Sequence, residues 1–191
     1  KGTQPYYPLP FQWSVHKWES IDKEIKLNDA ESFIDFESQN IEREFIKSLL
    51  KSVGETGTIF AHSASTEKSV LKRLKDKDNC SDLAEKIEKL INRVADTLNL
   101  VKKHFYSPLM NGDYGIKNII MSKSIPSDIS YNEKDNIGSG TDAQLAWFIY
   151  TKKNTSKKDK QKQIDLLIKY CSKDTLAMYH LLKYLINSSK K

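Results

Sequence analysis

A carboxylate lies on the apolar stripe of the last periodic segment of the chain. Residues 164–186 have helical spacing, and the stripe is marked by Leu167, Cys171, Met178 and Leu185. Asp174 falls on this stripe. An ionised carboxylate facing a core is costly unless it is paired, hydrogen-bonded or bound to a metal. Asp174 is therefore a candidate metal ligand. The alternative is an acid at the edge of the buried face that a neighbouring lysine or a backbone donor satisfies.

Two more residues have types and positions that suit the same chemistry. Tyr170 precedes Asp174 by one helical turn, so its hydroxyl can share a cleft with that carboxylate. Glu67 follows a predicted strand and lies in the first turn of a predicted helix, at the sheet edge where α/β proteins bind ligands. Ordinary explanations remain for both: a half-buried tyrosine, and an acid that favours a helix N-terminus.

Alternating strands and helices are needed to position these residues. The alternation of apolar and polar residues in Phe11 to Trp18 predicts a strand that pairs with a second strand within residues 25–36. Helical spacing before Gly54 predicts a helix over 41–53, and TIFAH predicts a buried strand over 58–62. A lysine-rich linker, TKKNTSKKDKQK, is expected before the last helix. Further helices are expected over 67–74, 83–94, 96–105 and 143–150.

Composition favours a single globular domain over residues 1–191. Hydrophobic residues make up 38 % of the chain, and the net charge of +6 is compatible with a polyanionic partner. Cys80 and Cys171 lie far apart without a CxxC motif, which gives little support to a disulfide framework or a zinc site. The sequence has no membrane-spanning run and no signal peptide, so a cytoplasmic protein without membrane contact is expected.

Three segments together resemble a known family. They are GTIFAHSASTEKSVLKRL (57–74), RVADTLNLVKKHFYSPLMNGDYGIKNII (93–120) and YCSKDTLAMYHLL (170–182). In this order they resemble a bacterial family of unknown function with the ribonuclease H-like fold, related to DnaQ-like 3′–5′ exonucleases of the DEDD type. The resemblance implies an α/β fold in which helices flank a mixed sheet.

The resemblance also implies roles for the candidate residues. Such exonucleases hold two Mg²⁺ or Mn²⁺ ions with four carboxylates, which are the hard oxygen ligands these cations take. Glu67 corresponds to the third carboxylate, where proofreading enzymes usually carry Asp, and Asp174 corresponds to the fourth. Tyr170 corresponds to the tyrosine of the YxxxD motif that orients the attacking water.

The first family motif, a DxE on the first strand, has no good counterpart in the chain. Asp35 and Glu37 have this spacing, but only one helix and one strand separate them from Glu67, and the family requires two further strands there. The true first strand is therefore expected upstream of residue 1, and Asp35 and Glu37 are expected at the surface. Asp96 is expected to open a helix outside the metal site.

Three functions are compatible with these observations. The leading prediction is a metal-dependent 3′–5′ exonuclease-like domain that hydrolyses terminal phosphodiesters of DNA or RNA. With two of the four carboxylates, this segment is expected to bind metal weakly. The second is a catalytically inactive module on the same fold that binds nucleic acid or protein through basic residues 152–162. The third is a mainly helical scaffold whose lysines are simply solvated.

Overall fold

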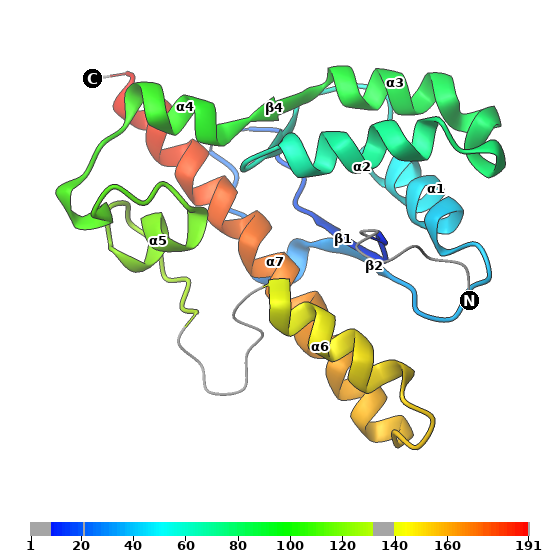
Figure 1. Cartoon of the computed structure of the whole chain (residues 1–191). Coiled ribbons are helices and arrows are strands. Elements are labelled where there is room, and N and C mark those ends of the chain that lie inside the picture. Colours follow the sequence, from blue (N-terminus) through cyan, green and yellow to red (C-terminus); the bar gives the residue numbers. More distant parts are fainter. Residues whose placement is uncertain (1–8, 21, 132–139, 191) are drawn as a thin grey trace.

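The computed structural model describes residues 9–20, 22–131 and 140–190 as a mixed α/β fold with two small sheets. Figure 1 shows the order of the elements. The strands are β1 (Gln12–Val15), β2 (Glu31–Ile34), β3 (Ile59–Ala61) and β4 (Val94–Asp96). The α-helices are α1 (Ile41–Val53), α2 (Ser65–Lys75), α3 (Ala84–Asn92), α4 (Thr97–His104), α5 (Ile116–Met121), α6 (Gly140–Thr151) and α7 (Lys157–Ser188). Short 3₁₀ helices are η1 (Leu27–Asp29), η2 (Asp78–Leu83) and η3 (Pro108–Met110).

The four strands form two separate pairs. β1 and β2 are antiparallel, with Trp13 opposite Phe33, which confirms the predicted pairing of these segments. β3 and β4 are parallel, with Ile59 opposite Val94. Within the described part of the chain, β1 and β3 each have one edge without a strand partner.

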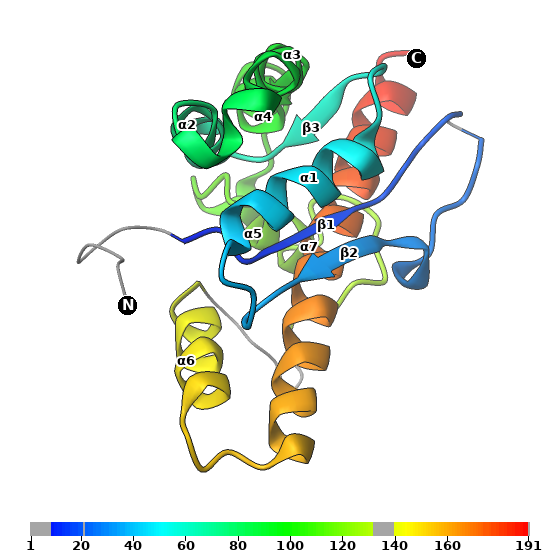
Figure 2. The ribbon, with the colours of Figure 1, turned by 90° about the vertical axis from the view of Figure 1, so that its right-hand side faces the viewer.

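A single hydrophobic cluster joins both strand pairs to helices α1, α2 and α3. Its fully buried members include Ile46, Leu74 and Ile87, and Trp13 and Ile59 pack against it. The indole of Trp13 also donates a hydrogen bond to Ser48 on α1 at 2.9 Å. In the view of Figure 2, α1 runs between β3 and the β1–β2 pair. The same helical layer therefore covers one side of both small sheets.

Helix α7 packs against the other face of the first sheet. Side chains alternate along a strand, so Gln12 and Ser14 point away from Trp13. They reach α7, where Gln12 donates to the carbonyl of Leu167 at 2.7 Å and Ser14 contacts Ser172. Further along α7, the ring of Tyr179 packs edge-on against Trp18. This packing fixes the middle of α7 against β1.

The first third of α7 pairs with α6 instead. Figures 1 and 2 show the two helices as an antiparallel hairpin that projects from the rest of the molecule. Trp147 of α6 contacts Phe11 and Phe36 and so attaches the hairpin to the ends of β1 and β2.

Two predicted elements need correction. The helix expected over 83–94 ends at Asn92, and Val94–Asp96 form β4. Val94 is buried and lies four residues after Leu90, so its spacing imitates a continued helix. The lysine-rich segment is a linker only in part, because α7 begins at Lys157. Ser156 caps this end, and its hydroxyl accepts a hydrogen bond from the Asp159 amide. The predicted helix over 41–53 is confirmed at both ends.

None of the helices in the described residues is long and apolar enough to cross a membrane.

Candidate functional site

Asp174 lies at the centre of a small polar cluster between α5 and α7. Tyr131 donates a hydrogen bond to Asp174 Oδ1 at 2.9 Å, and the Tyr170 hydroxyl lies close enough to the same carboxylate to lower its pKa. Lys117 Nζ donates to the Tyr170 hydroxyl at 2.6 Å. These four side chains, Asp174, Tyr170, Tyr131 and Lys117, are called the Asp174 cluster below. Tyr170 and Asp174, one helical turn apart in the sequence, therefore belong to the same cluster.

Packing on the neighbouring turns holds the cluster in place. Ile119 and Ile120 of α5 are buried against Ala177 and Leu181 of α7. Asn118 holds the preceding loop, because its amide donates to the carbonyls of Met110 and Asp113 at 2.8 Å. Lys117 belongs to this fixed helix, so its amino group is directed at α7.

Burial determines how these groups ionise. It raises the pKa of Asp174, although the Tyr131 hydrogen bond and the positive charge of Lys117 oppose the effect. Burial and the Asp174 charge raise the pKa of both tyrosines, which therefore act as neutral donors. Burial also raises the pKa of the Cys171 thiol to about 12, so this cysteine is not a thiolate nucleophile at neutral pH.

Glu67 lies in the first turn of α2, beside Asp96. Although the residue is exposed overall, protein surrounds part of its carboxyl group, and this desolvation together with the charge of Asp96 raises the pKa of Glu67. Asp96 caps α4 as predicted, because its Oδ1 accepts from the Leu98 and Ser63 amides at 2.9 and 3.0 Å.

His62 connects the surroundings of Glu67 to the segment that carries Lys117. Its Nε2 donates to the carbonyl of Tyr114 at 2.8 Å, and its Nδ1 lies 2.9 Å from the Thr97 hydroxyl. A carbonyl can only accept, so Nε2 carries the proton of the neutral ring. Burial lowers the pKa of His62, which favours this neutral form. His62 is therefore a structural link from the end of β3 to the loop before α5.

Asp35 and Glu37 make local contacts at the end of β2. Asp35 Oδ1 accepts from the amides of Glu37 and Ser38 at 2.9 and 3.0 Å, which is the geometry of an Asx turn. Glu37 accepts a hydrogen bond from the Tyr150 hydroxyl of α6 at 2.8 Å. Both carboxylates thus have structural partners.

The donor set for a metal ion is incomplete in the part of the chain described here. Glu67 and Asp174 are oxygen ligands of the right type, but no group of three or more His, Cys, Asp or Glu in the described ranges is arranged to hold an ion. Around Asp174 the contacts are two phenols and an ammonium group. A two-metal site would need carboxylates from outside the described residues.

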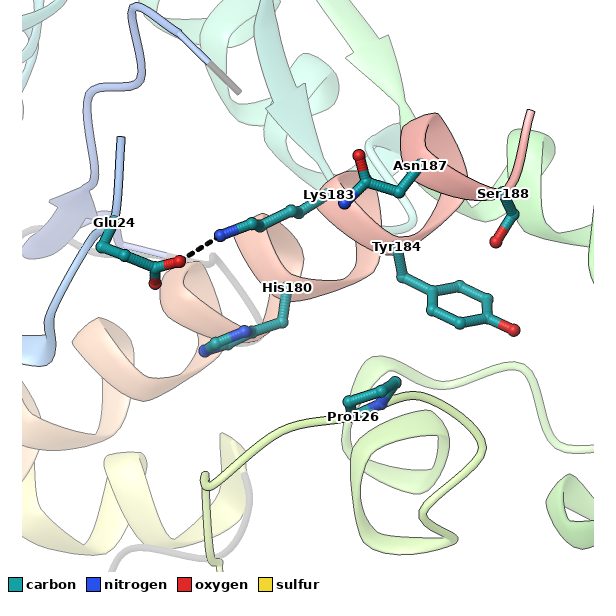
Figure 3. A pocket seen from close by; sticks show the side chains of 7 residues that line it. All are labelled: Glu24, Pro126, His180, Lys183, Tyr184, Asn187 and Ser188. Carbon is teal, nitrogen blue, oxygen red and sulfur yellow. Dashed lines mark hydrogen bonds and ion pairs between the residues drawn. The ribbon is translucent and has the colours of Figure 1, made fainter. Parts of the chain in front are cut away.

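A surface pocket of about 380 Å³ lies near the C-terminal end of α7 (Figure 3). An ion pair between Lys183 and Glu24 crosses one side of it, and His180 and Tyr184 line the wall. Glu67, Tyr170 and Asp174 are not among its described lining residues. The pocket is therefore separate from the predicted chemistry.

Sequence analysis missed two members of the Asp174 cluster. Lys117 and Tyr131 lie 53 and 43 residues from their partners on α7. Lys117 precedes a short apolar run, and Tyr131 follows a segment without periodicity, so no spacing rule links either residue to Asp174. The one available signal was the need of a buried carboxylate for a cation or hydrogen-bond donors.

Comparisons with known proteins give a family but no activity. Neither a curated protein nor a solved structure matches the chain. The family model for a domain of unknown function, DUF2779, matches residues 1–115. This match includes β1 to β4 and Glu67 and ends just before α5, so α7 and Asp174 lie beyond it. Because the match covers more than half of the sequence, the chain belongs to the DUF2779 family of domains of unknown function.

Proposed function

We propose that this chain is part of a metal-dependent 3′–5′ exonuclease-like domain with a ribonuclease H-like fold, acting on terminal phosphodiesters of DNA or RNA. The observation that carries the proposal is the YxxxD pair on α7. Tyr170 and Asp174 lie in one partly buried site, and each influences the pKa of the other. This arrangement agrees with the roles that the sequence resemblance implies for them.

The arrangement of the strands supports the proposed fold. An antiparallel pair and a parallel pair pack against the same helices, and β1 and β3 each keep a free edge in the described residues. One additional strand between those edges would join the two pairs into a mixed five-stranded sheet. In the proposed fold this is the strand that carries the DxE motif, and none of β1 to β4 in the described residues takes this place.

The roles of the chain's own residues follow from their contacts. Asp174 and Glu67 would supply two of the carboxylates, and the additional strand would supply the others. A bound Mg²⁺ or Mn²⁺ provides a Lewis acid for the phosphate and activates water. Tyr170, held by Lys117, would orient the attacking water through its hydroxyl, while Tyr131 fixes the Asp174 carboxylate.

The test uses the complete natural protein that contains this chain. A 3′-labelled single strand is incubated with Mn²⁺ or Mg²⁺, and nucleotide release is followed over time. We expect release from the 3′ end that stops on chelation of the metal and in Asp174→Asn. Cleavage that persists in EDTA, or that is equal in Asp174→Asn, would overturn the proposal.

A second candidate function is nucleic-acid binding without catalysis, and the α6–α7 hairpin favours it. Leu145 and Phe148 lie one turn apart on α6 and are 57 % and 68 % exposed. Lysines 152, 153, 157, 158 and 162 lie exposed in the turn and the start of α7. Aromatic side chains on which bases stack, beside cations that contact phosphates, are the features of single-strand binding surfaces.

Anisotropy of a labelled oligonucleotide in EDTA tests this second function. Binding is expected to weaken with salt, and also in Phe148→Ala and in Lys157→Glu/Lys158→Glu. Lys102→Glu/Lys103→Glu makes the same charge change on the exposed surface of α4 and serves as the control. Equal loss in both charge variants would show that net charge, rather than the hairpin, determines binding.

A further inference from the structure

The Asp174 cluster contains a cation of its own. The amino group of Lys117 lies 2.6 Å from the Tyr170 hydroxyl, and 4.2 and 5.5 Å from the centroids of the Tyr170 and Tyr131 rings. Both rings therefore contribute to stabilising the ammonium charge. Lys117 thus lies against the same two tyrosines that interact with Asp174.

The cation and the acid of the cluster are linked through its tyrosines. Lys117 donates to the Tyr170 hydroxyl, Tyr131 donates to Asp174, and Tyr170 lies close enough to the Asp174 carboxylate to lower its pKa. A hydroxyl that accepts from a cation becomes more strongly polarised, so Lys117 also strengthens the interaction of Tyr170 with Asp174. The positive charge of Lys117 also acts directly on the Asp174 carboxylate.

We propose that Lys117 is the internal counterion of Asp174, and that its ammonium group and a divalent cation compete for this carboxylate. The counterion role is supported by the contacts of the described residues. The competition with a divalent cation rests on the proposed function, which requires a metal at Asp174. In this arrangement the cluster is stable without metal, because a monovalent cation already offsets the partly buried negative charge.

The counterion role is tested by a double-mutant cycle in melting temperature, measured in EDTA. Lys117→Met keeps the aliphatic stem and removes the charge, and it should lower the melting temperature by several degrees. In the Asp174→Asn background the same change should have less than half of this effect, because no carboxylate remains to be neutralised. Lys117→Arg should retain most of the stability, and Lys102→Met on the exposed surface of α4 is the control for lost charge.

Equal losses of melting temperature in both backgrounds would overturn the counterion role, since Lys117 would then act only through packing. The counterion role would also be overturned if the Lys117→Met and Lys102→Met variants had the same melting temperature.

The competition is tested by calorimetric titration of Mn²⁺ into the complete natural protein. Lys117→Met should bind Mn²⁺ at least fivefold more tightly than wild type, and Lys117→Arg should not. Unchanged or weaker binding in Lys117→Met would overturn the competition. Absence of Mn²⁺ binding in every variant would overturn both the competition and the proposed metal-dependent function, whereas the stability cycle would still decide the counterion role.

Discussion

At the level of single residues, Asp174 and Tyr170 share a site but have different expected roles. Asp174 supplies a charge, whereas Tyr170 supplies a hydroxyl that Lys117 holds in place. Replacing each with a residue of similar shape separates the two roles, because Asn and Phe keep the packing of α7.

Asp174→Asn should lower nucleotide release by the complete natural protein at least about 100-fold and weaken Mn²⁺ binding, because the neutral amide cannot balance a divalent ion. Tyr170→Phe should leave Mn²⁺ affinity within about twofold and lower the rate about 10- to 100-fold, as expected for a group that orients a reactant. Release assays and calorimetry on both variants measure the two effects. Loss of Mn²⁺ binding in Tyr170→Phe equal to that in Asp174→Asn would contradict the assigned roles.

His16 predicts a pH dependence of stability. Its Nε2 donates to the carbonyl of Lys26 at 3.1 Å, and its Nδ1 lies 2.8 Å from the Thr175 hydroxyl of α7. Burial lowers the pKa of His16, so the unfolded chain binds a proton at higher pH than the folded one. The stability from this residue is therefore present above the unfolded value of about 6.5 and is lost as pH falls toward the lower folded pKa.

The measurement is the melting temperature from pH 7.5 to pH 5. The decline on acidification should be shallower in His16→Gln than in wild type, although His62 and His180, whose pKa values are also lowered by burial, keep part of it. His104→Gln, at an exposed position, is the control for the loss of a histidine. Identical slopes in His16→Gln and wild type would show that His16 is not the titrating group.

At the level of elements, local sequence signals explain which predictions succeeded. Helix 41–53 shows strong helical periodicity and is followed by Gly54. Gly54 has a φ of +59°, a backbone conformation that glycine adopts readily and that ends the helix. β4 was missed because three residues give too little alternation to be distinguished from the buried face of α3. Pairing with β3 defines this strand, so the local residue pattern does not predict it.

The N-terminal cap of α7 should contribute measurably to stability. Ser156→Ala removes the hydroxyl that accepts from the Asp159 amide and should cost about 1 kcal/mol of unfolding free energy. Urea denaturation measures the difference. Ser69→Ala changes an exposed serine within α2, where alanine is the better helix former, and should cause no loss.

The turn after β2 provides a test of the DxE alternative. Asp35→Ala with Glu37→Ala removes the Asx turn and the Tyr150 hydrogen bond, so the melting temperature should fall. Nucleotide release by the folded complete natural protein should stay within about twofold of wild type. Abolished cleavage in a folded double variant would identify residues 32–38 as the first catalytic strand and overturn the proposed strand order.

At the level of the whole molecule, the two strand pairs remain separate, and each of the four strands in the described residues has one free edge. Phe11 accepts from the Asp35 amide, so the backbone groups of Phe11 and Trp13 face β2, whereas those of Gln12 and Ser14 face the free edge. The Ile59 amide donates to Arg93 near β4, which leaves the Phe60 amide on the free edge of β3. Sequence alone could predict the β1–β2 pairing, but not these edges, because edge position depends on which strands are neighbours.

Hydrogen exchange followed by NMR checks the proposed additional strand. In residues 1–191, the amides of Gln12, Ser14 and Phe60 should exchange faster than those of Trp13 and Ile59. In a longer chain that supplies the additional strand, the same three amides should become protected by at least about 100-fold, because carbonyl groups of the added strand accept their hydrogen bonds. Equal exchange in the two forms would contradict an additional strand at these edges.

The placement of the three tryptophans gives the protein separate intrinsic fluorophores for separate parts of the fold. Trp13 packs against the hydrophobic cluster of α1, α2 and α3, Trp18 meets the Tyr179 ring of α7 edge to face, and Trp147 joins the α6–α7 hairpin to Phe11. Variants that keep one indole at a time therefore emit from the strand core, the middle of α7 or the base of the hairpin. Their emission spectra can report whether the hairpin detaches before the strand core unfolds, without any external label.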